Sequence, residues 1–251
     1  MEGQPRLTPR LRSSPSFRVQ VLPIAAFYDA RCNVAVNALA EVSSHRNHRV
    51  RLRCCRMLAY FLVFLPDRYD HQQRLLPYVL SFVNDAVPAI REAALRCVET
   101  CGLQYEREHP DEVVERRQFG VDGDDAIDYN SHLPAPFATR PSLGARLFVR
   151  ANTSRFFHAL LRELSHWRRD TRRRSAELLL VLTAYCEERL AQDFHRTLAA
   201  LARARAADRV EAGGGHDPTL ATVQAILRSL AKYSAGDDTM ARELAQVQSV
   251  L

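Results

Sequence analysis

The chain alternates between stretches in which apolar side chains recur every three or four positions and short polar breaks. This spacing places the apolar side chains on one face of an α-helix. In residues 75–83, apolar positions fall at i, i+1, i+4, i+5, i+7 and i+8, which predicts a helix with one wide buried face. Pro88 suits the first turn of the next helix, which we expect to run towards Glu108 and to stop before Pro110. The same spacing predicts further helices over residues 31–42, 49–65, 144–167, 170–185, 194–201, 218–230 and 238–251.

Residues 109–141 interrupt this helical pattern. They contain four prolines and two glycines, and the overlapping stretch 106–130 carries nine acidic residues against three arginines. A long stretch without helical spacing is typical of a functional or a disordered insertion. We therefore expect an acidic loop, and two roles stay open for it: contact with a basic partner, or passive disorder. Its candidate contact residues are Asp122, Asp124, Asp125 and Asp128.

An internal repeat organises the helices. Arg51 and Arg91 lie 40 residues apart, and Arg172 follows 81 residues later, which is one repeat plus an insertion the size of the acidic loop. Each arginine follows a polar turn, near the start of a helix. We expect these arginines to reach turn carbonyls or acids of a neighbouring repeat, with Asp85 as the partner of Arg91 and Asp170 as the cap of its helix. The period resembles that of HEAT repeats, whose helix pairs stack into an α-solenoid.

Longer strings of residues narrow this resemblance. In chain order they are Leu-Pro-Asp-Arg-Tyr at 65–69, Asn-Asp-Ala-Val-Pro-Ala-Ile-Arg at 84–91, Gly-Leu-Gln-Tyr at 102–105, Arg-Pro-Ser-Leu-Gly at 140–144 and Ser-His-Trp-Arg at 165–168. Their order and spacing resemble the HEAT-repeat axonemal dynein assembly factor family over about residues 45–205. The insertion also sits at the same place as in that family.

The resemblance implies an all-α, non-catalytic scaffold without a cofactor, which helps to preassemble axonemal dynein arms in the cytoplasm. The partners it implies are axonemal dynein chains, other dynein assembly factors and chaperone machinery. Family members usually have more repeats on both sides, so a fragment, a divergent member and an incomplete gene model all stay open. The repeat alone permits a second hypothesis, a generic HEAT adaptor in transport or nucleic-acid-associated complexes.

Four segments are predicted from these patterns. Residues 1–30 form a basic tail, for which we favour disorder over mitochondrial targeting because prolines interrupt any amphipathic helix. HEAT-like repeats are expected over residues 31–108, the acidic loop over 109–141, and further HEAT-like repeats over 142–251 with a glycine-rich break at 213–215. The apolar last helix has no polar cap, which predicts self-association of the chain.

Composition excludes several classes of protein. Apolar residues make up 47% and charged residues 25% of the chain, as in ordinary globular proteins. The longest apolar run, residues 58–65, is far shorter than the roughly 20 residues of a membrane span. The phosphate-binding, hydrolase and metalloprotease motifs are absent, so we expect no enzyme activity. The six cysteines form no C-x-x-C pair, and we expect reduced, buried thiols.

Two groups of residues in the chain have side chains of the kinds that bind metal ions. His45 and His48 lie near the cysteines at 54–55, but structural zinc sites use two tightly spaced ligand pairs. The aspartates after residue 121 suggest a calcium loop, yet Ile127 stands where an EF-hand needs glycine and Leu133 where it needs glutamate. No metal site is therefore expected.

Residues 167–174 place five arginines beside the single tryptophan of the chain. One interpretation is nucleic-acid binding, and the other is an inter-repeat turn whose arginines cap helices, pair with acids and face solvent. The net charge of +6 is spread along the chain and mixed with acids, which favours the turn. The possible protein contacts of this turn are Arg168, Arg169, Arg173 and Arg174.

Overall fold

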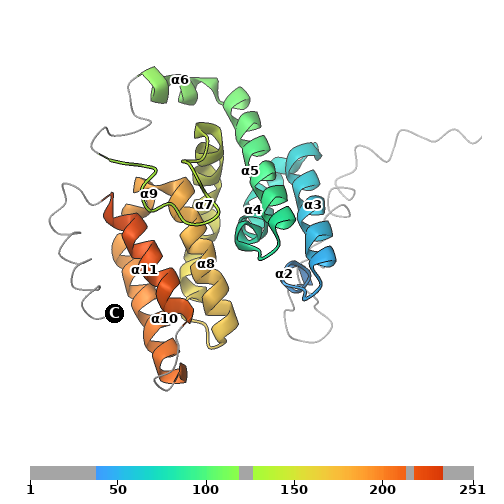
Figure 1. Ribbon diagram of the computed structural model, residues 1–251. Helices are drawn as coiled ribbons and strands as arrows, with labels where there is room; N and C mark the ends of the chain where they lie inside the picture. Colours follow the sequence, from blue (N-terminus) through green and yellow to red (C-terminus); the bar gives the residue numbers. More distant parts are fainter. Residues whose placement is uncertain (1–37, 119–126, 213–217, 234–251) are drawn as a thin grey trace, which may run out of the picture. The chain divides into compact units, whose positions relative to one another are not determined.

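A computed structural model describes residues 38–118, 127–212 and 218–233 (Figure 1). All regular elements in these ranges are helices, which confirms the predicted all-α fold of antiparallel helix pairs. The chain divides into two compact units, residues 1–54 and 55–251, and the boundary falls inside a helix. No helix in the described ranges combines the length and the apolar content needed to cross a membrane.

The first unit contributes α2 (Ala38–Ser43) and the beginning of α3 (His48–Phe64). Asn47 starts α3, because its Oδ1 accepts the N–H of Arg49 at 2.9 Å. This side chain satisfies one of the backbone donors that the first turn of every helix leaves free.

The second unit is built from helix pairs. Its main helices are α4 (Gln72–Ser81), α5 (Pro88–Glu108), α7 (Leu143–Glu163), α8 (Arg169–Cys186), α10 (Phe194–Ala212) and α11 (Pro218–Ala231). Helices α4 and α5 pack on each other and on α7, while α8 packs against both α7 and α11 (Figure 1). Each pair thus covers the apolar face of the next, the packing on which α-solenoids depend.

The predicted apolar face of residues 75–83 is buried as expected. Leu75, Leu76, Val79, Leu80 and Val83 have no exposed surface. Helix α4 ends at Ser81, and a short 3-10 turn, η5 (Phe82–Asn84), continues the buried face towards α5. Pro88 occupies the first turn of α5, as its fixed φ predicts.

Two glycines allow α5 and α7 to approach closely. A Cβ atom built on Gly102 of α5 would lie 2.6 Å from Cα of Ala145. The N–H of Gly144 donates to Oε1 of Glu106 at 2.8 Å, so a side chain of α5 caps the beginning of α7. The close contact fixes this inter-repeat packing immediately after the acidic segment.

The stretch expected to be a loop contains a helix. After α5 ends at Glu108, α6 (Pro110–Gln118) begins at a proline, which is favourable in the first turn. Val113 of α6 is buried against Leu143 and Leu147 of α7, and this tertiary contact explains why the acidic sequence is helical. Short helical turns η4 (Arg68–Asp70) and α9 (Glu188–Ala191) complete the described elements.

Candidate interaction site

The three repeat arginines make the same backbone contact. In each case Nη1 donates to the carbonyl oxygens of the residues six and five positions earlier, in the turn that precedes the helix. The distances are 2.8 and 3.2 Å from Arg51 to His45 and Arg46, 2.7 and 3.0 Å from Arg91 to Asp85 and Ala86, and 2.8 and 2.9 Å from Arg172 to His166 and Trp167. Each arginine therefore holds its own inter-helix turn.

The two predicted aspartates differ in outcome. Asp85 is a partner of Arg91 as expected: its main-chain oxygen accepts from Nη1 of Arg91, and its Oδ1 accepts the N–H of Val87 at 2.9 Å. Asp170 is not the cap of α8: the helix begins at Arg169, because the carbonyl of Arg168 already accepts helical bonds, and Asp170 lies exposed in the first turn.

Arg172 also makes a buried ion pair. Its Nε donates to Oδ1 of Asp208 at 2.9 Å, its Nη2 contacts the same oxygen, and Nη2 also lies 2.8 Å from Oε2 of Glu211. Arg172 and Asp208 are completely enclosed. The turn between α7 and α8 is thus held by α8 and anchored to α10.

The side chain of Trp167 projects from this anchored turn. It is 78% exposed, although tryptophan usually has much of its surface buried. The ring of His166 stacks beside it at 5.7 Å between centroids, and the guanidinium of Arg168 lies 5.6 Å from its ring. We refer to residues 165–169 as the Trp167 turn.

The other predicted contact arginines differ in their exposure and in their partners. Arg174 is exposed, and Arg173 pairs with Glu177 at 3.1 Å. Burial raises the pKa of Glu177 above its usual value, opposed by the charges of Arg173 and Arg174. Nε and Nη2 of Arg169 are shielded from solvent and have no hydrogen-bond partner in the described structure.

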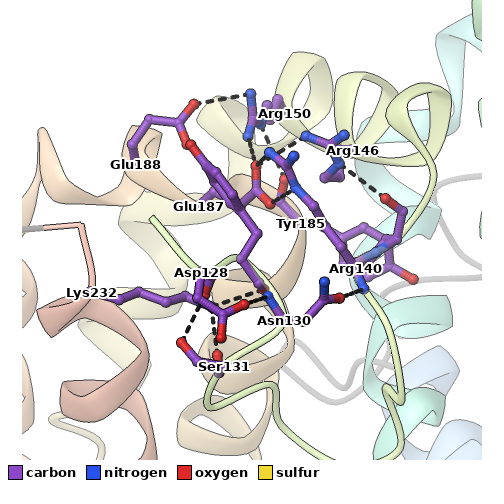
Figure 2. Close-up of polar contacts among 12 residues, drawn as sticks. Asp128, Asn130, Ser131, Arg140, Arg146, Arg150, Tyr185, Glu187, Glu188 and Lys232 are labelled. Carbon is purple, nitrogen blue, oxygen red and sulfur yellow. Dashed lines mark hydrogen bonds and ion pairs between the residues drawn. The ribbon is translucent and has the colours of Figure 1, made fainter. Parts of the chain in front are cut away.

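A second arginine cluster lies at the other end of α8 and was not predicted (Figure 2). The carboxylate of Glu187, 1% exposed, accepts from Nε and Nη2 of Arg140 at 2.6 and 2.7 Å, from Arg146 at 3.1 Å and from Arg150 at 2.5 Å. Arg150 also lies 3.3 Å from Glu188. Three guanidinium groups thus converge on one enclosed carboxylate. The i, i+4 spacing of Arg146 and Arg150 in an apolar helix was the only sequence signal for it.

Glu187 has the backbone angles φ 50° and ψ −130°, which are unfavourable for a residue with a side chain. The strained residue ends α8 and turns its carboxylate towards α7. Such strain persists where the surrounding contacts fix the conformation, and the three arginines supply those contacts.

The same cluster fixes the end of the acidic segment. The N–H of Arg140 donates to Oδ1 of Asn130, and its guanidinium stacks on the ring of Tyr129 at 3.6 Å. Directly after α11, Nζ of Lys232 donates to the carbonyl of Ser131 at 2.9 Å (Figure 2). Oδ1 of Asp128 accepts the N–H of Asn130. Residues 127–142 are therefore held between α7, α8 and α11, whereas Asp122, Asp124 and Asp125 lie outside the described residues.

The cysteines of the described ranges are free and buried. Burial raises the pKa of the Cys54 and Cys186 thiols to about 11, and the neighbouring Cys101 with burial raises that of Cys97. Reactive thiols show the opposite shift. No group of three or more histidine, cysteine, aspartate or glutamate side chains in the described part of the chain is placed to hold a metal ion.

Comparison with known proteins gives two family matches. A model described as "Dynein axonemal assembly factor 5, HEAT-repeat domain" matches residues 131–212. A second, "Dynein axonemal assembly factor 5-like, TPR repeats", matches residues 29–116, where the sequence predicts HEAT-like pairs. Both repeat types are built from helix pairs. No solved structure matches the chain.

Curated relatives carry the same name. The chain is similar to dynein axonemal assembly factor 5 of Homo sapiens, with 33% identity over 62% of this chain and 17% of the human protein. The Xenopus laevis protein is 32% identical over 56% of this chain and 16% of its own length. The Mus musculus protein is 30% identical over 67% of this chain and 20% of its own length. The chain thus spans about a fifth or less of these relatives. Two models named for one protein family thus match separate segments of the chain, which is similar over both to the HEAT-repeat dynein axonemal assembly factor family.

Proposed function

We propose that this protein is a non-catalytic scaffold in the cytoplasmic preassembly of axonemal dynein arms. It binds dynein chains and co-assembly factors, and works with chaperone machinery. The observation that carries the proposal is the match of two separate repeat segments, in chain order, to models of one assembly-factor family. The names of the relatives in three vertebrates agree with it.

The chemistry of the described residues supports binding rather than catalysis. Its large pKa shifts are those of thiols and phenols, Cys54, Cys186, Tyr185 and Tyr233, which burial holds in the protonated form. Protonated, buried thiols are poor nucleophiles. The exposed aromatic and arginine side chains around the Trp167 turn belong to the residue types enriched in protein interfaces.

Deletion of the gene in the ciliated or flagellated cell that expresses it tests the proposal. Thin-section electron microscopy of axonemes is expected to show lost dynein arms, and cytoplasmic extracts reduced dynein complexes. Re-expression of the wild-type chain is expected to restore both. Axonemes with a full set of arms after deletion would contradict the proposal.

A further inference from the structure

We propose that the Trp167 turn binds an acidic segment of a protein partner, with Trp167 as the central contact. Only the identity of the partner, a protein of dynein-arm assembly, rests on the proposed function. The contact chemistry follows from the turn itself. Trp167 exposes most of its ring, and tryptophan and arginine are the residue types that most often dominate binding energy at interfaces.

The turn is organised before any partner binds. Arg172 fixes the carbonyls of His166 and Trp167, and its buried contacts with Asp208 and Glu211 fix Arg172 in turn. A side chain presented by a rigid turn loses little conformational freedom on binding, so more of its contact energy appears as affinity. At the corresponding turn before α5, Ala86 stands where Trp167 stands here.

The charge around Trp167 defines the partner. Arg203 of α10 is exposed, and its Nε donates to Oγ of Ser165 at 3.3 Å, while the exposed Arg162 lies in the last turn of α7, directly before the Trp167 turn. Within the turn, Arg168 is exposed. Carboxylates accept paired bonds from exposed guanidinium groups of this kind.

An acidic protein segment fits this surface better than nucleic acid does. The exposed side chains of Glu163 and Asp170 adjoin the same arginines, and Glu211 is 42% exposed beside Arg172. A continuous line of phosphates would meet these carboxylates with like charge. A peptide can instead place individual carboxylates at the arginines and an apolar side chain on the indole.

The single tryptophan makes the proposal directly measurable, because all tryptophan fluorescence of the intact chain comes from Trp167. The probe is a short synthetic peptide of aspartate and glutamate around a central leucine, titrated into the full chain. A matched peptide with the acids replaced by asparagine and glutamine is the control. The acidic peptide is expected to shift the emission to shorter wavelength and to protect the indole from acrylamide quenching, and added salt is expected to weaken the effect.

Two variants separate the contact from folding. With a labelled acidic peptide, Trp167→Ala and Arg168→Ala are each expected to weaken binding about ten-fold or more, as for central interface residues. Arg96→Ala is the matched control, since Arg96 is exposed on α5 and pairs only weakly with Glu92 at 3.6 Å. Equal circular dichroism of the variants excludes unfolding as the cause.

Three outcomes would overturn the inference. These are an unchanged emission with the acidic peptide, equal binding of the neutral peptide, or tighter binding of single-stranded DNA than of the acidic peptide. Capture of proteins from cell extracts distinguishes a failure of the proposed function from a failure of the Trp167 contact. A wild-type chain that captures no dynein assembly proteins contradicts the proposed function. Capture that Trp167→Ala leaves unchanged contradicts only the Trp167 contact.

Discussion

Arg172 of α8 and Asp208 of α10 form an enclosed ion pair that also fixes the turn carrying Trp167. The pair joins helices that are consecutive repeat elements, and neither side chain has significant contact with water. One arginine therefore holds a local turn and a contact between repeats.

Arg172→Ala is expected to lower the free energy of unfolding by about 3–5 kcal/mol, because it leaves the carboxylate of Asp208 buried without its partner. Arg91→Ala is the matched variant, since Arg91 makes the same carbonyl contacts and is half-buried. It is expected to cost about 1–3 kcal/mol. Urea unfolding of both variants checks this, and equal losses would contradict the role assigned to Asp208.

Neighbouring glutamates allow a similar comparison at the second arginine cluster. Glu187→Gln is expected to destabilise the protein by about 3–5 kcal/mol, because three arginines then converge on a neutral group. Glu188→Gln is expected to cost under about 1 kcal/mol, because its side chain is 48% exposed. Unfolding midpoints in urea measure both, and a Glu187→Gln variant as stable as Glu188→Gln would refute the assignment.

Gly102→Ala is expected to destabilise the protein by about 1–3 kcal/mol, since the added methyl group meets the backbone of Ala145 on α7. The sign is informative, because glycine to alanine in an open helix position stabilises by about 1 kcal/mol. Leu103→Ala, at an exposed neighbouring position, serves as the control. A more stable Gly102→Ala protein in thermal unfolding would show that α5 and α7 are not in close contact.

The described thiols are expected to react slowly with Ellman's reagent in the folded protein. A pKa of about 11 leaves about one thiol in a thousand ionised at pH 8, and burial limits access further. The assay uses a Cys32→Ser variant, because residue 32 lies outside the described ranges. Full reaction is expected only after urea is added, and rapid reaction without urea would be evidence against buried, free thiols.

The helices and their repeat were predictable from local patterns. Apolar spacing located the helices that became α4 and α8, and Pro88 marked the beginning of α5. The predicted cap at Asp170 was wrong by two residues, because Arg168 occupies the cap position of α8 and makes no side-chain capping bond. Helix α6 was missed because its stability comes from burial of Val113 against α7.

The second arginine cluster, around Glu187, was not predictable for a different reason. Its members lie at residues 140, 146, 150 and 187, and no local period connects them. Only packing of α7 against α8 brings them together. The Trp167 turn was found because its aromatic and basic residues are adjacent in sequence, although its anchor at Asp208 was not.

The most direct test of the central claim is affinity purification of the tagged, full chain from the cytoplasm of its own ciliated or flagellated cells, followed by mass spectrometry. An assembly scaffold is expected to recover axonemal dynein chains together with other assembly factors and chaperones. Recovery of nuclear-transport, ribosomal or nucleic-acid complexes in their place would contradict the proposed function.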